Sequence, residues 1–365
     1  MKNCDVLVVG GGPAAAVCAN ELASRGLTVS VASGLTSHAS RKCNQFISPS
    51  ADAFLRNCGL SLPSDVSNPL DEFSLAWEEE ARSFLMFKDW FANPAAVLLR
   101  PAFDLWLLNC ASGAGAEILN GATVYQVTRR NGEWYSDVKM HATNITVRSR
   151  FVVEATGKRN RSLYYSDATR SYIDRLVGHC CTVQLAAMSA PFFGIRSAQN
   201  GWWYLGISKD GGGTATYFSD SDLVVSGFRR TEFLDSILSL LKTPHGTFSR
   251  ISAWHAHDSR TSIRKLQWRN NWLCIGDCSW SIDPLSGRGI QLAVSHGFET
   301  AKAIASVQES QTHEALRSLA KERVRDFSRA LGTRNEIYSK ANQHRGHKFW
   351  ERRLKPGLPF RCIDE

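Results

Sequence analysis

The first thirty residues alternate between short apolar runs and one apolar stretch with a helical period. Residues 5–9 form an apolar run typical of a buried strand, and a Gly-Gly-Gly-Pro turn separates it from a helix expected to reach Arg25. A turn at Gly26 then leads to a second apolar run at 27–31. This succession predicts a strand, a helix and a second strand, the unit from which parallel sheets are built.

Later segments repeat this change from an apolar run to a turn or a helix. The pattern predicts a helix at 100–113, a strand at 151–154 that stops at Ala-Thr-Gly, and a strand at 272–275 that stops at Gly-Asp. A turn with one proline and two glycines separates that last strand from an apolar-periodic helix at 290–304. The free N–H groups of such a helix beginning favour anions and electron-rich ligand edges.

The middle of the chain is richer in strand patterns. Residues 201–207 and 214–219 flank a glycine turn at 211–213, which predicts a hairpin, and a helix is expected at 231–241. Aromatic residues gather in two parts of this region, the stretch 71–97 and the Gly-Trp-Trp-Tyr run of the hairpin. They are candidates for pocket walls, although aromatic side chains more often simply fill a core.

Composition narrows the possible classes. The chain has 365 residues, ten cysteines without a Cys-x-x-Cys pair, and no apolar run long enough to span a bilayer. The N-terminus enters a fold-forming strand at once, so we expect no signal peptide and a cytoplasmic protein with reduced thiols. His255-x-His257-Asp258 is the best local metal candidate, but no third ligand is evident, so no metal is expected.

Net charge is concentrated at the C-terminal end. The chain carries +9, and residues 317–355 hold twelve Lys or Arg against four acidic residues. One interpretation is a solvated helix face, and the other is a docking surface for an acidic partner or an anionic ligand. No pattern of a nucleic-acid-binding fold accompanies these charges, so nucleic acid is not an expected partner.

The glycine turn after the first strand has the dinucleotide-binding form Gly-x-Gly-x-x-Ala. Gly10 permits the tight turn, Gly12 lets the backbone approach a pyrophosphate, and the small Ala15 lets the helix sit close on the strand. Pro13 and Ala14 complete the start of the helix. The sequence therefore predicts a dinucleotide cofactor here.

One departure concerns the ribose position of that fingerprint. The acidic residue that usually ends the second strand is absent, and Ser33 stands nearby. A neutral serine hydroxyl holds a ribose less strongly than a carboxylate. The alternative is that Arg41 or Lys42 contacts the cofactor instead.

The order of these segments resembles the p-hydroxybenzoate-hydroxylase superfamily of FAD proteins, in its halogenase and geranylgeranyl-reductase-like branch. The resemblance rests on the Gly-rich unit, Arg-x-x-Phe-Asp from Arg100, Ala-Thr-Gly, Gly-Trp-Trp and Asp-Pro-Leu-Ser-Gly-Arg-Gly-Ile from Asp283. Gly-Trp-Trp-Tyr with Tyr-Phe-Ser-Asp-Ser-Asp is most similar to the LodB/GoxB-like flavoproteins, which mature cysteine-tryptophylquinone oxidases.

This resemblance implies an α/β (α+β) fold with a Rossmann-like FAD-binding domain, an inserted β-sheet substrate domain and a helical, basic C-terminal region. The expected limits are 1–70, 98–170 and 250–315 for the FAD-binding domain, 71–97 and 171–249 for the substrate domain, and 316–365 for the C-terminal region.

The resemblance also implies which residues hold FAD. Arg100 would lie against the cofactor, Asp277 would accept hydrogen bonds from the ribityl chain, and Pro284 would form part of the wall beside the flavin. The full expected set is Gly10, Gly12, Pro13, Ala14, Ala15, Ser33, Arg41, Lys42, Arg100, Ala155, Thr156, Gly157, Gly276, Asp277, Pro284, Gly287, Arg288, Gly289 and Ile290. Asp277 as a helix cap and Pro284 as a plain turn residue are the structural alternatives.

The implied reaction is oxygenation of a tryptophan in a precursor of a partner oxidase, with O₂ as co-substrate and NAD(P)H or reduced flavin as electron source. His255, His257 and Asp283 are candidates for moving protons, with Pro284 beside the reacting centre. The precursor would dock near the aromatic middle or the basic C-terminal region.

Three alternatives remain. A halogenase is disfavoured because the Trp-x-Trp-x-Ile-Pro segment is missing and Lys88 is the nearest counterpart of the halogenase lysine. A flavin-dependent alkene reductase would share the Arg-x-x-Phe-Asp segment. A non-catalytic flavoprotein that assists a partner oxidase would have the same FAD shell.

Overall fold

A computed structural model gives the fold of the chain. The described residues are 1–34, 45–70, 72–77, 85–86, 95–140, 143–158, 162–185, 191–224 and 250–354. Arg41, Lys42, Lys88 and the helix expected at 231–241 lie outside them, as does most of the aromatic stretch 71–97.

Eight described strands form the first sheet. Its five parallel strands are, in order, β8 (Glu117–Asn120), β2 (Val29–Ser33), β1 (Lys2–Val9), β11 (Thr143–Glu154) and β21 (Trp272–Cys274), and β20 (Trp268–Arg269), β9 (Ala122–Arg130) and β10 (Glu133–Met140) are antiparallel additions. At its centre, β2, residues 6–9 of β1 and residues 151–154 of β11 are buried, as parallel strands covered on both faces must be.

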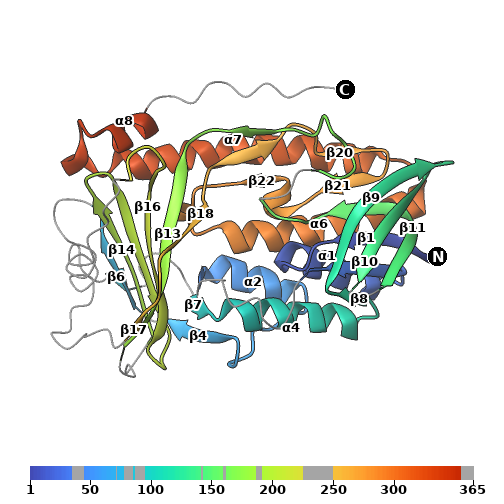
Figure 1. Cartoon of the computed structure of the whole chain (residues 1–365), viewed down its shortest axis with the longest axis horizontal. Helices are drawn as coiled ribbons and strands as arrows, with labels where there is room; N and C mark the ends of the chain where they lie inside the picture. Colours follow the sequence, from blue (N-terminus) through green and yellow to red (C-terminus); the bar gives the residue numbers. More distant parts are fainter. Residues whose placement is uncertain are drawn as a thin grey trace.

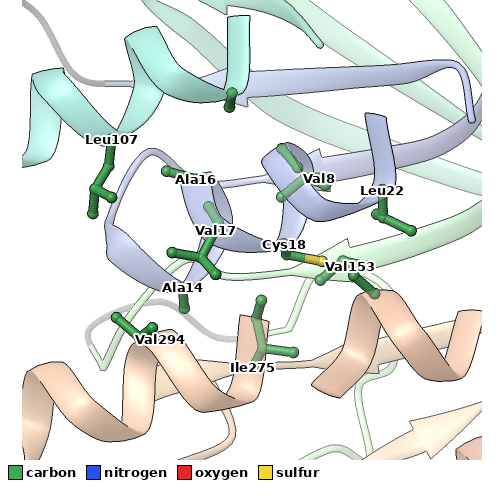
Figure 2. Close-up of a cluster of buried hydrophobic side chains, with 14 of the residues drawn as sticks. Val8, Ala14, Ala16, Val17, Cys18, Leu22, Leu107, Val153, Ile275 and Val294 are labelled. Atoms are coloured by element: carbon green, nitrogen blue, oxygen red, sulfur yellow. The ribbon is translucent and has the colours of Figure 1, made fainter. Parts of the chain in front are cut away.

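Helices cover this sheet and continue beyond it. The described α-helices are α1 (Pro13–Ser24), α2 (Pro49–Asn57), α4 (Arg100–Gly113), α6 (Gly289–Ser310), α7 (Glu314–Ser339) and α8 (Lys348–Leu354), with short 3₁₀ turns η1 (Gly276–Cys278), η2 (Pro284–Ser286) and η3 (Asn342–His344). Figure 2 shows α1 surrounded by apolar side chains from β1, β11, α4 and α6. A side chain at Gly297 of α6 would come within 2.6 Å of the Ala14 carbonyl oxygen, so small residues let these two helices touch.

The second sheet is nearly all antiparallel. Its described strands are β18 (His255–Asp258), β17 (Arg250–Ile251), β13 (Leu176–Gln184), β16 (Gly212–Asp220), β15 (Gly201–Ile207), β14 (Phe192–Ala198), β5 (Glu72–Ala76) and β6 (Leu85–Met86). β15 and β16 form the expected hairpin, with Trp203 opposite Tyr217. Figure 1 shows this sheet at one end of the molecule and the first sheet at the other.

Two three-stranded sheets lie between the large ones. One contains β3 (Gln45–Ile47), β7 (Ala95–Leu98) and β4 (Ser67–Leu70), and the other contains β12 (Arg170–Tyr172), β19 (Ser262–Arg264) and β22 (Trp280–Ser281). The second of them holds the chain just before and after the Gly-Asp turn, because β19 precedes β21 and β22 follows it.

The C-terminal helices connect the two ends of the molecule. Figure 1 shows α7 running along the top from β20 to the second sheet, where α8 lies. Trp350 of α8 and Tyr338 of α7 are buried against Trp202 of β15. The Trp350 indole N–H is shared between the main-chain oxygens of Ala198 and Gln199, both at 3.1 Å.

Three of the basic side chains in this region are buried, which neither interpretation of the sequence anticipated. Arg323, Arg334 and Arg353 are buried, and Arg353 donates to Asp220 at 2.7 Å. Arg352 reaches Asp220 at 2.8 Å. The exposed ones are Arg317, Lys321, Arg325, Arg329, Lys340, Arg345 and Lys348. None of the helices in the described part of the chain combines the length and apolarity that a membrane crossing needs.

Several boundaries differ from the sequence expectation. The second strand is β2, Val29–Ser33, rather than 27–31, and α6 extends over Gly289–Ser310 rather than 290–304. The long helix α6 continues because its buried face persists through Val307. Gln311 in the left-handed conformation then ends it.

Candidate active site

The glycine turn after β1 contains two glycines with different surroundings, Gly10 and Gly12. Gly10 has φ +134°, and a side chain there would come within 2.2 Å of the Ala155 carbonyl oxygen. Gly12 is the N-cap of α1, with φ −83° and ψ 179°, and a side chain there would meet nothing within 4 Å. The open space at Gly12 and the uncapped N–H groups behind it form a cradle that suits a phosphate.

The Ala-Thr-Gly segment lies against this turn. The Ala155 N–H donates to the Val9 carbonyl oxygen at 2.8 Å, which holds the end of β11 beside the end of β1. The Thr156 hydroxyl lies 3.6 Å from Cys278 Sγ. Gly157, with φ +74°, turns the chain away. The structure thus brings this segment to both the first glycine turn and the Gly-Asp turn.

The Gly-Asp turn adjoins the start of α1. Gly276 has φ +58°, and a side chain there would come within 2.9 Å of the Ala14 Cβ. Asp277 is exposed, and its carboxylate accepts no hydrogen bond from any described residue. An open carboxylate beside a phosphate cradle fits the polyol hydroxyls of a dinucleotide. It caps no helix by its side chain, which was the structural alternative.

Two arginines hold this turn by its main chain. Arg170 donates to the carbonyl oxygens of Asp277 at 2.8 Å and Cys278 at 2.7 Å. The buried Arg264 donates to the Cys278 oxygen at 3.0 Å. The carbonyl groups are therefore satisfied from behind, while the Asp277 carboxylate is left on the open side.

A buried histidine completes the turn, and sequence reasoning did not identify it. His296 of α6 accepts the Gly276 N–H at its Nδ1 at 3.1 Å. The buried Arg323 of α7 donates to the His296 carbonyl oxygen at 3.1 Å and to the Thr300 hydroxyl. Burial, and then the nearby Arg323 charge, hold the pKa of His296 well below its usual value. The ring is therefore neutral and remains an acceptor for the turn.

This histidine gives a pH prediction. The unfolded chain protonates the imidazole near pH 6.5 and the folded chain does not, so folding stability falls on acidification below that pH, by about 1.4 kcal/mol per pH unit for one proton. His296→Asn keeps an acceptor but removes the titration, so its unfolding free energy, measured in urea between pH 5 and 7, falls less steeply. His313→Asn, at an exposed position, is the matched control. Equal slopes for wild type and His296→Asn would contradict the assignment.

The segment from Pro284 to Ile290 forms an open edge at the start of α6. Pro284, Arg288 and Gly289 are exposed, and Ile290 is buried. Gly287 has φ +61°, and a side chain there would lie 3.8 Å from the Phe46 ring. The first N–H groups of the 22-residue helix α6 thus open toward an aromatic surface.

Asp283, a candidate for proton transfer, is wholly buried and paired. One carboxylate oxygen accepts the Leu285 N–H at 3.1 Å and so caps η2. The other accepts the Tyr338 hydroxyl at 2.8 Å and the Arg334 Nε at 3.3 Å. These contacts make Asp283 the anchor of the Pro284 turn, and a role in moving protons stays a prediction.

The second sheet presents an aromatic face to this edge. Phe46 stacks on Phe193 of β14 with ring centroids 4.9 Å apart, and Phe193 meets Tyr204 of β15 edge to face at 5.1 Å. The chain of contacts Gly287, Phe46, Phe193, Tyr204 connects the start of α6 to the sheet. We call the side of the sheet that carries Phe193, Tyr204, Phe218 and His257 the aromatic face.

His255 and His257 belong to β18 and point to the same side of the sheet, because residues two apart on a strand share a side. His255 Nε2 lies 2.8 Å from Cys180 Sγ on β13. His257 meets the edge of Phe218 at 5.9 Å. It fits there because its partner on β13 is Gly178, where a side chain would come within 2.4 Å of the imidazole.

Two other predicted residues, Arg100 and Ser33, lie at the start of α4 and the end of β2. Arg100 forms a largely buried ion pair with Asp104 at 3.1 Å and also donates to the Gln45 side chain. Ser33 is buried at the end of β2. Arg100, Ser33 and the other cofactor assignments stay predictions.

The comparisons with known proteins agree with this geometry. A family model described as "Tryptophan halogenase" matches residues 98–356. LodB of Marinomonas mediterranea, named as an FAD-dependent oxidoreductase, is 22% identical over 97% of this chain and 97% of its own.

Solved structures of known enzymes share the fold. A peptidyl tryptophan dihydroxylase, QhpG, described as essential for tryptophylquinone cofactor biogenesis, covers 100% of this chain and 80% of its own, with TM-score 0.77 and 22% identity. The myxobacterial chondrochloren halogenase CndH covers 97% of this chain and 86% of its own, with TM-score 0.81 and 17% identity. The family match confirms the resemblance to halogenase-like flavoproteins that the sequence predicted, and the solved structures confirm the α/β fold.

The family model spans well over half of the chain. This protein therefore belongs to the tryptophan halogenase family, and it is an enzyme of the flavin-dependent oxidoreductase class.

Proposed function

We propose that this enzyme is an FAD-dependent monooxygenase that hydroxylates the indole of a tryptophan in a partner protein, a precursor of a tryptophylquinone oxidase. The observation that carries the proposal is the aromatic face, with its two imidazoles, opposite the open start of α6. The resemblance to LodB and to the structure of a peptidyl tryptophan dihydroxylase supports the choice of a peptidyl tryptophan.

Residues of the chain fit FAD at both ends. The space at Gly12 would take the pyrophosphate, the Asp277 carboxylate would hold the ribityl hydroxyls, and the start of α6 would face the ring. Bound FAD, reduced by NAD(P)H or by reduced flavin, supplies the activation of O₂ for transfer of one oxygen atom to an electron-rich ring. The second oxygen atom leaves as water.

Residues of the chain would bind the indole, shield it from water and accept its proton. The first N–H groups of α6 would stabilise negative charge on the flavin ring when it is bound and reduced. The aromatic face packs the indole and keeps water away, which favours oxygen transfer over loss of peroxide. His255 or His257 would accept the proton that the ring carbon loses when its C–H bond is replaced by C–O.

Intact mass of the precursor tests this function. The purified enzyme, loaded with FAD and supplied with NAD(P)H, a flavin reductase and O₂, is expected to add one or two oxygen atoms to one tryptophan, with label from ¹⁸O₂. The same reaction with bromide tests the halogenase alternative. If the precursor keeps its mass while the bound flavin is reduced and reoxidised, the hydroxylase proposal is wrong and a non-catalytic or different role remains.

A further inference from the structure

A cleft of about 880 Å³ lies on the outside of the protein beside β18. One wall is formed by Tyr172 at the end of β12 and the residues that follow it, and the other by Ala256, His257 and Asp258 of β18. The cleft therefore lies between two strands that both stand at the edge of their sheets. None of the cofactor positions discussed above belongs to it.

The register of β18 leaves main-chain groups pointing into this cleft. The Ser259 N–H donates to the Leu176 oxygen, so the hydrogen-bonded pairs with β13 include His257 with Gly178. The alternate residues Ala256 and Asp258 must then direct their N–H and C=O groups away from β13. The Asp258 main-chain oxygen accepts a hydrogen bond from Lys158 Nζ at 3.4 Å. No strand in the described part of the chain pairs with this edge of β18.

The walls of the cleft contain a stacked arginine and tyrosine, and a histidine that also contacts the aromatic face. The Arg260 guanidinium lies 3.7 Å from the centre of the Tyr172 ring, and Tyr172 is 45% exposed. His257 lines the cleft and also contacts Phe218 on the aromatic face. A chain lying along β18 therefore reaches the aromatic face at His257. Figure 1 places β18 at the margin of the second sheet.

We infer that this cleft binds an extended peptide segment of the protein substrate, which adds to β18 as a further strand and delivers its aromatic side chain past His257. An edge strand with free main-chain groups recognises an extended chain of almost any sequence, and pockets for alternate side chains give the specificity. This inference rests on the proposed function and specifies how the precursor docks.

Ala256→Pro tests the main-chain contact. The Ala256 N–H points away from β13, so proline removes a donor to the peptide without breaking a bond of the sheet, and edge strands accept proline at such positions. We expect KM for the precursor to rise at least about tenfold, with kcat little changed. Ala256→Val, which keeps the N–H, is the matched control. The FAD spectrum and reductant oxidation without precursor are expected to match wild type in both variants.

A second measurement uses the FAD-loaded wild-type enzyme and twelve-residue peptides that span the target tryptophan. Methylating alternate main-chain nitrogens of the peptide is expected to abolish binding in one phase and to spare it in the other, because only every second N–H of an added strand faces β18. Equal binding of both phases, or an unchanged KM in Ala256→Pro, overturns the docking inference while the hydroxylase function stands. Peptide binding without any gain of oxygen would instead contradict the proposed function alone.

Discussion

Gly12→Ala is expected to abolish tight FAD binding while leaving the folded protein intact, whereas Gly10→Ala is expected to destabilise the fold strongly. The backbone at Gly12 is one that alanine adopts, and its side chain would enter empty space, so the apoprotein changes by less than about 1 kcal/mol. A pyrophosphate in that space would collide with the new methyl group, so we expect FAD affinity to fall by well over an order of magnitude.

Gly10 differs because the obstruction is the protein itself. Its φ of +134° is unfavourable for alanine, and the new methyl group would lie 2.2 Å from the Ala155 oxygen. Strain and overpacking together cost on the order of 3 kcal/mol or more. Urea unfolding of the apoproteins and titration with FAD, followed by flavin fluorescence, separate the two effects. If Gly12→Ala binds FAD with wild-type affinity, the pyrophosphate does not bind at this turn.

The features that the sequence predicted correctly are those encoded by neighbouring residues. The strand, glycine turn and helix up to Ser24 follow from one apolar run and one helical period, and the β15–β16 hairpin follows from two strand patterns around a glycine turn. In each case the residues that pair or pack are close in the chain. The pattern alone therefore determines the element.

The features that the sequence did not predict depend on partners far away in the chain. His296 looks like one polar residue in an apolar helix, and its role appears only when Gly276 and Arg323 are brought to it. The basic stretch looked like a surface because arginine is usually exposed, yet Arg323 and Arg353 face groups in α6 and β16. A helical period places such a residue on the buried side but does not name its partner.

Asp283 shows the same limit within the candidate site. The sequence made it a candidate for moving protons, and the structure shows it as the cap of η2 and the partner of two α7 residues. Gly178 is the converse case. A glycine inside a strand indicates a close approach, but only the register with β18 shows that His257 occupies the space.

Arg334→Met is expected to be the most destabilising change at the interface between α7 and the candidate site. The Arg334 side chain is 5% exposed and lies between two carboxylates, with Nη2 3.0 Å from Asp174 and Nε 3.3 Å from Asp283. Methionine fills a similar volume but leaves both carboxylates buried without their cation. Removing one partner of a buried ion pair costs about 3–5 kcal/mol.

Arg329→Met is the matched control, since it removes an arginine of the same helix whose side chain is 72% exposed and paired with Asp326. An exposed pair of this kind contributes about 0–1 kcal/mol. Urea unfolding of both variants measures the difference. Because Asp283 also caps η2, Arg334→Met is further expected to loosen the Pro284 turn and to raise peroxide release per reductant oxidised. If Arg334→Met unfolds at the same urea concentration as Arg329→Met, the buried ion pairs with Asp174 and Asp283 do not anchor this turn.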